Sequence, residues 1–244
     1  MNKVLSIVIP AYNEEKTIRK ILEKVSTFFL PEGFTREVII INDCSKDRTR
    51  DIVEHFIKGK KEYSLINNEK NLGKTQSVKK GLLETKGNWV VIQDADLEYE
   101  PEDLSHMLDW ALSKDLDVVY GDRFGGDNGL LYLSFFVGNK FVSFVSNLFT
   151  FPRIKKWIPD MEVCYKLVRG SVIRKIAPNI SATSSFGLEP EITARLAKYR
   201  LKDKHLKWGV IPVRYYPRTI EQGKKIRYTD GIKAILEIIK YNLF

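Results

Sequence analysis

LSIVIPAYNE, residues 5–14, joins a short apolar run to a polar segment at a proline. The run 5–9 lacks polar alternation, which is typical of a strand buried on both faces of a parallel sheet. Residues 15–28 then place apolar side chains at helical spacing. This strand-and-helix unit recurs, with strands expected at 38–41, 63–66, 89–92 and 117–120 and helices at 46–57, 74–85 and 102–112. The pattern predicts an α/β fold with a mostly parallel sheet and helices on both faces.

The second half of the chain is less regular. Residues 170–176 and 189–199 are expected to be helical, 210–216 to form a strand, and 230–241 to form an amphipathic closing helix. No internal repeat, low-complexity tract or flexible linker divides the sequence. We therefore expect a single domain over residues 1–244, with halves at 1–125 and 126–244.

The composition is that of a basic globular protein. The 244 residues carry a formal net charge of +9, and 43% of them are hydrophobic. Such a charge suits an anionic partner, either nucleic acid, acidic lipid or a phosphorylated substrate, although a solvated lysine-rich surface is the simpler alternative. No nucleic-acid-binding motif is recognisable, so we expect no nucleic-acid partner. Cys44 and Cys164 lie far apart, which fits a reducing, cytoplasmic compartment and argues against a zinc site.

Three polar segments follow predicted strands. They are residues 10–14, 42–45 and 94–96, and all are rich in carboxylates and amides. In open parallel sheets, ligands bind beyond the carboxyl ends of the strands. Asp94 and Asp96 can share a divalent cation and its phosphate ligand, because Mg²⁺ and Mn²⁺ prefer such oxygen ligands. Asp43 can accept hydrogen bonds from a base or ribose, or it caps the following helix.

Several basic residues are candidates for phosphate contact. Lys74 stands near a helix N-terminus, a place suited to anions, although a plain surface turn is the alternative. Arg123 follows the strand at 117–120 and could bind a phosphate with two hydrogen bonds. Arg218 and Lys224 belong to a basic loop at 218–227, for which a solvated surface is the default interpretation.

Together these motifs resemble those of the family 2 glycosyltransferases with the GT-A fold. The resemblance rests on segments 7–15, 42–45, 71–74 and 94–96. Later segments, at 160–167, 186–191, 216–218 and 221–226, are similar to dolichol-phosphate mannose synthases and related polyprenyl-phosphate glycosyltransferases. The resemblance covers nearly the whole chain. It implies a GT-A-type, Rossmann-like sheet with a nucleotide-sugar-binding half at 1–125, an acceptor and membrane-proximal half at 126–244, and a C-terminal amphipathic region.

The resemblance also implies residue roles. A nucleotide-sugar would be held by Pro10, Ala11, Tyr12, Glu14, Asp43, Lys74, Asp94 and Ala95. Asp96 would bind the divalent metal, Mg²⁺ or Mn²⁺, and Glu98 would be a second ligand at a position where relatives often carry Gln. Arg123, Arg218 and Lys224 would contact diphosphate or acceptor phosphate and, with Asp96, carry catalysis. The QxxRW signature of processive synthases is missing, which indicates transfer of a single sugar.

The function expected from this is inverting transfer of one hexose from a nucleotide-sugar, such as GDP-mannose or UDP-glucose, to a polyprenyl phosphate of the dolichyl type. A phosphate acceptor is already ionised and hardly needs a general base. A near alternative is a family 2 enzyme acting on a sugar hydroxyl in surface polysaccharide or glycolipid synthesis, with Asp160, Glu189 or Glu191 as base. A non-catalytic nucleotide-binding regulatory protein is the alternative from another class.

Residues 130–151 form the longest mostly apolar stretch of the sequence, and the nucleotide-sugar site does not account for it. Gly138, Asn139 and Lys140 interrupt it, so we reject a membrane span. One helical face is apolar, because apolar side chains recur at i, i+3, i+4 and i+7 in Phe141, Phe144, Val145 and Leu148. A pure core role is one interpretation. Basic and aromatic residues flank the stretch, so we expect residues 130–157 to dock the protein peripherally on the cytoplasmic face of a membrane.

Overall fold

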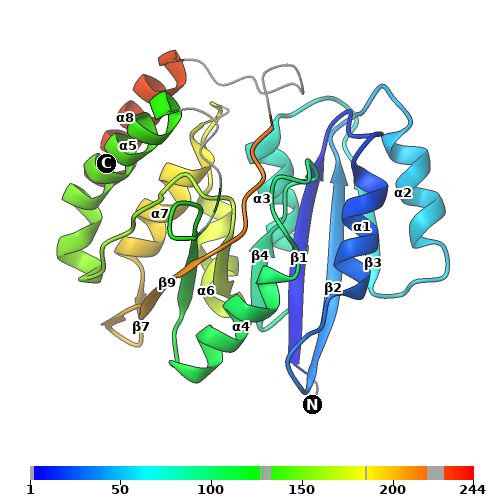
Figure 1. Ribbon diagram of the computed structural model, residues 1–244, viewed down its shortest axis with the longest axis horizontal. Helices are drawn as coiled ribbons and strands as arrows, with labels where there is room; N and C mark the ends of the chain where they lie inside the picture. Colours follow the sequence, from blue (N-terminus) through cyan, green and yellow to red (C-terminus); the bar gives the residue numbers. More distant parts are fainter. Residues whose placement is uncertain (1–2, 127, 129–132, 185, 219–227) are drawn as a thin grey trace.

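Residues 3–126, 128, 133–184, 186–218 and 228–244 are described by the structure, a computed structural model. Its centre is a seven-stranded sheet in the order β3-β2-β1-β4-β6-β5-β9 (Figure 1). Six strands run in parallel, and β6 is antiparallel to both neighbours. The predicted α/β fold with a mostly parallel sheet is therefore confirmed.

The first half alternates strands and helices as predicted, with ends that differ by a few residues. β1 (Lys3–Ala11) pairs with β2 (Phe34–Asn42) on one side and with β4 (Trp89–Ile92) on the other. β3 (Tyr63–Asn67) extends the sheet beyond β2. The other elements are α1 (Ile18–Thr27), α2 (Thr49–Ile57), α3 (Lys74–Glu84), α4 (Asp103–Ser113) and β5 (Val118–Asp122).

The second half completes the same sheet. β6 (Lys166–Arg169), which we did not predict, inserts between β4 and β5. The strand predicted at 210–216 is β9 (Trp208–Pro212), which pairs with β5. The remaining elements are α5 (Leu133–Ile154), α6 (Gly170–Ile176), the short 3₁₀ helix η1 (Ala177–Asn179), α7 (Leu188–Lys198), the two-stranded β7 (Arg200–Leu201) and β8 (Lys204–His205), and α8 (Tyr228–Leu243).

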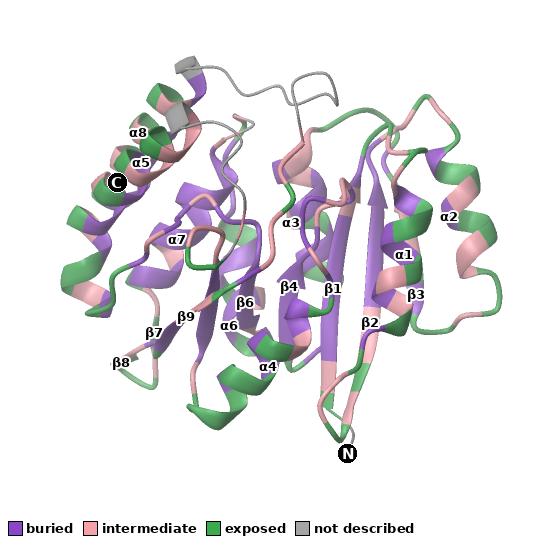
Figure 2. Cartoon of the chain, viewed as in Figure 1, coloured by how far each residue is buried: buried purple, intermediate pink, exposed green. Residues whose placement is uncertain are grey.

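Helices cover both faces of the sheet, as predicted. In Figure 1, α1 and α4 lie in front of it and α3 and α6 behind. β1, β4, β5 and β6 are buried over most of their length, as the purple colour in Figure 2 shows. Gly81 of α3 lets that helix lie close to the sheet, because a Cβ there would stand 2.4 Å from Ile41 Cδ1 and 2.5 Å from Val8 Cγ1. The sheet and its helices thus share one apolar core.

α5 and α8 form an outer layer that packs on α7 and lies at one side of the molecule (Figure 1). Their shared interface buries a small cluster of Val142, Met161, Ala234 and Ile238. The helix that we predicted around Phe141 is confirmed, and three of the four apolar residues named on its face are exposed. Val145 instead packs partly against the small cluster. Within the described residues, no helix is both long and apolar enough to cross a membrane.

Candidate active site

The loops after β1 and β2 lie side by side at the carboxyl ends of the parallel strands. The Lys46 amide donates to Asn13 Oδ1 at 2.8 Å, and the Glu14 amide donates to Thr49 Oγ1 at 2.8 Å. Asn13 adopts a φ of 56°, a left-handed conformation that asparagine tolerates well. These cross-links bring the first two polar segments together, as the sequence predicted.

Asp43 has a structural role that the sequence did not reveal. Its side chain is buried, and Oδ1 accepts from Asn68 Nδ2 at 2.8 Å and from the Leu72 amide at 2.9 Å. Its Oδ2 accepts from the Gly73 amide at 2.8 Å. Gly73 has a φ of 82°, which favours glycine, and stands directly before α3. Asp43 therefore shapes the turn that leads to Lys74, and contact with a nucleotide stays a prediction for it.

The residues at the end of β1 differ in exposure. Ala11 is buried, Pro10 is partly buried, and Tyr12 is exposed, so a ring is available at the rim of the strand ends. Glu14 is partly buried, and burial raises the pKa of its carboxyl group. Its Oε2 accepts from Thr17 Oγ1 at 2.8 Å. The structure places this group next to the loop after β2, and donor binding by it remains a prediction.

Lys74 joins two carboxylates. Its ammonium lies 2.9 Å from Asp94 Oδ1 and 3.4 Å from Glu189 Oε1, which belongs to the first turn of α7. Burial would raise the pKa of Asp94, but the ion pair with Lys74 outweighs it and the pKa is lowered. Lys74 thus keeps Asp94 ionised and ties α3 to α7. We expected an anion to bind at the N-terminus of α3, where Lys74 stands. In the structure Lys74 already pairs with two carboxylates of the protein.

The third strand end holds Asp96 and Glu98 opposite Arg218. Arg218 Nη2 lies 2.8 Å from Asp96 Oδ2, and its Nε lies 3.3 Å from Glu98 Oε1. The Arg218 amide also donates to Glu98 Oε1 at 2.9 Å, and Tyr215 Oη donates to Glu98 Oε2 at 2.7 Å. The structure therefore brings Arg218 to Asp96 and Glu98, two predicted site residues that lie more than a hundred positions away in the sequence.

The electrostatics of this group fit a cation. Burial, Asp94 and Glu98 raise the pKa of Asp96 to about 7, because negative charges crowd in a poorly solvated place. Among the described residues, the cation paired with Asp96 and Glu98 is the Arg218 guanidinium. Within the described residues, no set of three or more His, Cys, Asp or Glu side chains could hold a metal. Two carboxylates do fit an Mg²⁺ or Mn²⁺ ion that takes its other ligands from phosphate and water.

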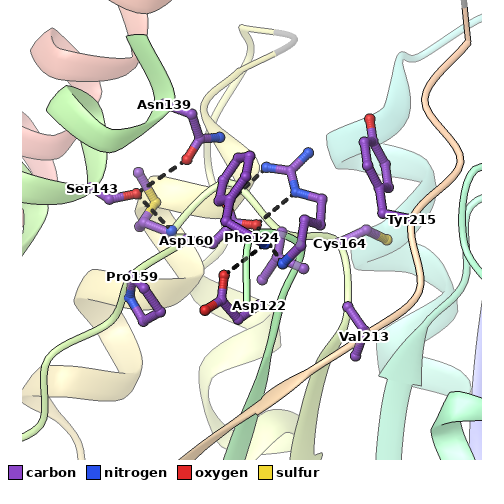
Figure 3. A network of polar contacts seen from close by, with 12 residues as sticks. Asp122, Phe124, Asn139, Ser143, Pro159, Asp160, Cys164, Val213 and Tyr215 are labelled. Carbon is purple, nitrogen blue, oxygen red and sulfur yellow. Dashed lines mark hydrogen bonds and ion pairs between the residues drawn. The ribbon is translucent and has the colours of Figure 1, made fainter. Parts of the chain in front are cut away.

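Arg123 is paired with a carboxylate of the protein. Its Nε donates to Asp160 Oδ2 at 2.6 Å and its Nη2 donates to Asp160 Oδ1 at 2.7 Å, and Asp160 is fully buried. Asp160 lies at the centre of a polar network beside Asn139 of α5 (Figure 3). With its amide nitrogen turned toward Asp160, Asn139 donates to Oδ1 at 3.1 Å and accepts from Arg123 Nη2 at 2.8 Å. The guanidinium is therefore committed to a carboxylate and an amide.

Arg123 is nevertheless close to the carboxylate site. Its guanidinium lies 5.0 Å from the centre of the Tyr215 ring, and the hydroxyl of Tyr215 is bound to Glu98. Asn128 ties the same loops together, because its Nδ2 donates to the Arg123 carbonyl at 2.8 Å and its Oδ1 accepts from the Tyr215 amide at 3.0 Å. Phosphate contact by Arg123 stays a prediction. Lys224, the fourth residue expected to carry catalysis, lies outside the described residues.

Sequence reasoning assigned no role to two ionisable residues near β6, Glu162 and Lys166. Burial, and to a smaller extent the negative charge of Glu189, raise the pKa of Glu162 to about 8. The Oε1 atom of Glu162 is buried and has no hydrogen-bond partner among the described residues. Lys166 is buried as well, and its Nζ contacts the Val163 carbonyl and stands 4.9 Å from the centre of the Tyr120 ring. Both residues precede or begin β6, the strand that we did not predict, so no periodic signal marked them.

A family model described as "Glycosyl transferase family 2" matches residues 6–176. Among curated proteins, a dolichyl-phosphate beta-glucosyltransferase of Trichomonas vaginalis is 37% identical over 38% of this chain and 30% of its own length. A second enzyme of that name and organism is 24% identical over 98% of this chain and 73% of its own length. An uncharacterized protein of Methanocaldococcus jannaschii is 25% identical over 95% of this chain and 97% of its own.

Solved structures share the fold. Glucosyl-3-phosphoglycerate synthase from Mycobacterium tuberculosis, in complex with Mn²⁺, UDP and glucosyl-3-phosphoglycerate, superimposes with a TM-score of 0.68. It is 16% identical, and the match covers 99% of this chain and 80% of that one. A mannosyltransferase from Pyrobaculum calidifontis, in complex with GDP-Man and Mn²⁺, gives a TM-score of 0.56 at 16% identity, over 87% of this chain and 55% of that one.

Proposed function

Because this chain belongs to glycosyl transferase family 2, we propose that it transfers one hexose from a nucleotide-sugar to a polyprenyl phosphate of the dolichyl type, with inversion at the anomeric carbon. The names of two relatives support the acceptor, since both are dolichyl-phosphate beta-glucosyltransferases. The donor would lie across the carboxyl ends of β1, β2 and β4, where Tyr12, Asp94 and Asp96 stand.

The choice of a phosphate acceptor rests on one observation. The three carboxylates that could serve as a general base all have partners within the protein. Asp160 is held by Arg123 at 2.6 and 2.7 Å, and Glu189 contacts Lys74 at 3.4 Å. Glu191 is fully buried and accepts hydrogen bonds from the amides of residues 181 and 182 and from Arg195. Each of the three carboxylates therefore already has cationic or amide partners within the protein. A phosphate acceptor, which brings its own negative oxygen, suits such a site.

The chain's residues would divide the remaining work. Asp96 and Glu98 would hold Mg²⁺ or Mn²⁺, which when bound supplies positive charge that stabilises the departing diphosphate. Arg218 would move from these carboxylates to the phosphate oxygens, which it can bind with two parallel hydrogen bonds. Lys74 would keep Asp94 charged and in place. Catalysis would thus rest on positioning and on charge stabilisation.

The acceptor proposal has a direct test. The protein is incubated with Mn²⁺ and radiolabelled UDP-glucose or GDP-mannose, and with either a short-chain polyprenyl phosphate or the matching polyprenol. We expect label to enter the lipid fraction with the phosphate and not with the alcohol, because Asp160, Glu189 and Glu191 all have partners among the described residues. Transfer to the polyprenol or to a sugar hydroxyl at a similar rate would support the alternative family 2 activity instead.

A lipid acceptor requires contact with a membrane, and α5 and α8 offer a surface for it. We call this surface the docking face, and it comprises Val137, Phe141, Phe144, Leu148 and Phe151 of α5, Ile232, Leu236 and Leu243 of α8, and Trp157. The five α5 side chains recur every three or four residues and are 45–58% exposed. Exposed apolar stripes of this kind mark interaction sites. With Arg153, Lys155 and Lys156 at its end, the docking face suits the cytoplasmic leaflet of an anionic membrane.

Vesicle co-sedimentation tests the docking face. The variant Phe144→Ser/Leu148→Ser removes two of its side chains. The control Phe29→Ser/Leu83→Ser makes the same two changes at exposed positions of the first half. We expect wild type and control to pellet with anionic vesicles and the α5 variant to stay in solution. Equal pelleting of a folded α5 variant would argue that these helices are not the membrane contact.

A further inference from the structure

A hollow of about 590 Å³ lies at the end of the molecule opposite the strand ends that carry Asp96. It is lined by the last turns of α5, the end of α7, and the hairpin of β7 and β8. These elements meet at the lower left of Figure 1, below the α5 and α8 layer. Its lining residues are Leu148, Phe149, Pro152, Arg153, Ala197, Lys198, Arg200 and His205. The transfer reaction described above uses none of them.

The polar lining is entirely basic. Arg153, Lys198, Arg200 and His205 contribute to it, and it contains no carboxylate. Across the described residues, Arg153, Lys198 and Arg200 form no ion pair with an acid. Other arginines of this half are paired, as Arg195 is with Glu191 at 2.6 Å. The hollow therefore gathers positive charge that the described protein does not balance.

Burial and neighbouring positive charges lower the pKa values of two lining residues. Burial is the largest cause for Lys198, and the positive charges of Arg153 and Arg195 add to it. For His205, burial is again the largest cause, and the charges of Arg200 and Lys155 lower the pKa further. Lys198 donates to the Tyr241 carbonyl at 2.7 Å, and Arg153 Nη1 contacts the Phe149 carbonyl. His205 Nδ1 is buried with no hydrogen-bond partner among the described residues. Several donors thus remain for an anion that would also relieve the repulsion.

The opposite wall is apolar and continues onto the docking face. Leu148, Phe149 and Pro152 form it, and Leu148 is 58% exposed as a member of the docking face. A ligand that filled the hollow would therefore meet cations on one side and hydrocarbon on the other. This combination suits an amphiphile with an anionic headgroup better than a free anion.

The hollow is also too far from the transfer site to hold the acceptor phosphate. Glu189, which contacts Lys74 beside Asp94, lies in the first turn of α7, and Lys198 ends that helix. At 1.5 Å per residue the two ends of α7 are separated by about 14 Å. A phosphate in the hollow cannot react at Asp96, so a ligand here would bind without being a substrate.

We propose that this hollow is a binding site for the phosphate headgroup of an anionic phospholipid, whose acyl chains lie against Leu148 and the rest of the docking face. The proposal rests on the docking face of the proposed function. The site would fix how α5 and α8 lie on the bilayer, and with them the distance of the transfer site from the membrane surface.

The test compares two variants with equal loss of charge. Lys198→Gln/Arg200→Gln removes two cations from the lining, and Lys202→Gln/Lys204→Gln removes two exposed cations from the same hairpin that do not line the hollow. Binding to phosphatidylcholine vesicles with and without phosphatidylglycerol is titrated at constant ionic strength. We expect the lining variant to lose about tenfold in affinity for the phosphatidylglycerol vesicles, and the control about twofold or less.

Each outcome has one interpretation. Equal losses in the two variants would overturn the site and leave only general surface charge. A wild-type protein that bound neither vesicle would refute the docking face, and the headgroup site with it. A thermal shift with soluble glycerol phosphate, but no difference between the variants on vesicles, would assign the hollow to a free phosphate and overturn the lipid. Transfer to a short-chain polyprenyl phosphate in detergent should be unchanged in the lining variant, and this separates the site from the transfer activity.

Discussion

Replacing Arg218 with glutamine should change metal binding and turnover in opposite directions. In the structure its guanidinium lies 2.8 Å from Asp96 and 3.3 Å from Glu98, where a cation would otherwise balance the two carboxylates. A metal that binds without donor must therefore displace this side chain. The same side chain, once released, is the group that we expect to contact the diphosphate.

The size of the effect follows from the exposure of the pair. The Arg218 side chain is 32% exposed, so solvent screens its ion pairs and we assign them about 1 kcal/mol in total. Removing this competitor should tighten the binding of Mn²⁺ alone by about fivefold, since 1.4 kcal/mol corresponds to a factor of ten. Loss of the phosphate contact should lower kcat/KM for transfer by about tenfold or more.

Isothermal titration with Mn²⁺, in the absence of donor, measures the first quantity. The titration is run above about pH 8, because burial, Asp94 and Glu98 raise the pKa of Asp96 to about 7 and protons would otherwise compete with the metal. Arg214→Gln is the matched control, because Arg214 pairs with Asp103 and Glu102 instead. Unchanged or weaker Mn²⁺ binding in the Arg218 variant would refute the competition, whatever happens to turnover.

Asp96→Ala should abolish transfer while leaving the far-ultraviolet circular dichroism spectrum unchanged, and full activity of the wild type in EDTA would contradict a metal at this position. Asp160→Ala should lower the free energy of unfolding by about 3 kcal/mol in urea titrations, because it leaves the partly buried Arg123 without its carboxylate partner. A loss below about 1 kcal/mol would show that the Arg123 charge finds another partner or reaches water. Glu162 should make the protein less stable as the pH rises from about 4.5 to about 8, because over that window the folded state keeps a proton that the unfolded state releases. Melting temperatures across that range should fall in the wild type relative to Glu162→Gln, and parallel curves would place the pKa of Glu162 near its ordinary value.

The strands of the first half could be predicted because each contains a short, mostly apolar run without polar alternation. The same rule fails for β6, whose four residues begin with Lys166 and end with Arg169. Lys166 is buried there with its ammonium 4.9 Å from the centre of the Tyr120 ring, a contact that no periodicity signals. β7 and β8 have two residues each, too few to establish a pattern.

The candidate site, too, could be predicted only in part from the sequence. The sequence predicted that the carboxylate-rich strand ends would lie together, because parallel strands share one edge. It did not predict their partners, since Asp96 and Arg218 are 122 positions apart and Arg123 and Asp160 are 37 apart. Such pairs depend on how loops from the two halves meet, and this is decided by packing across the whole molecule.

The position of β6 has a consequence for how this protein is synthesised. Within the first half, β1 is the partner of β4, and β5 has no partner. The second edge of β4 pairs with β6, and β5 pairs with β6 and β9, once the second half has been made. A nascent chain that has left the ribosome only as far as residue 125 would therefore expose one edge of β4 and both edges of β5, which can pair with other chains. Closing the sheet requires contacts between β4 and β6 across more than seventy residues, and such long-range closure is slow. The period between the emergence of β5 and that of β6 is thus when this polypeptide is most exposed to aggregation and most in need of chaperones.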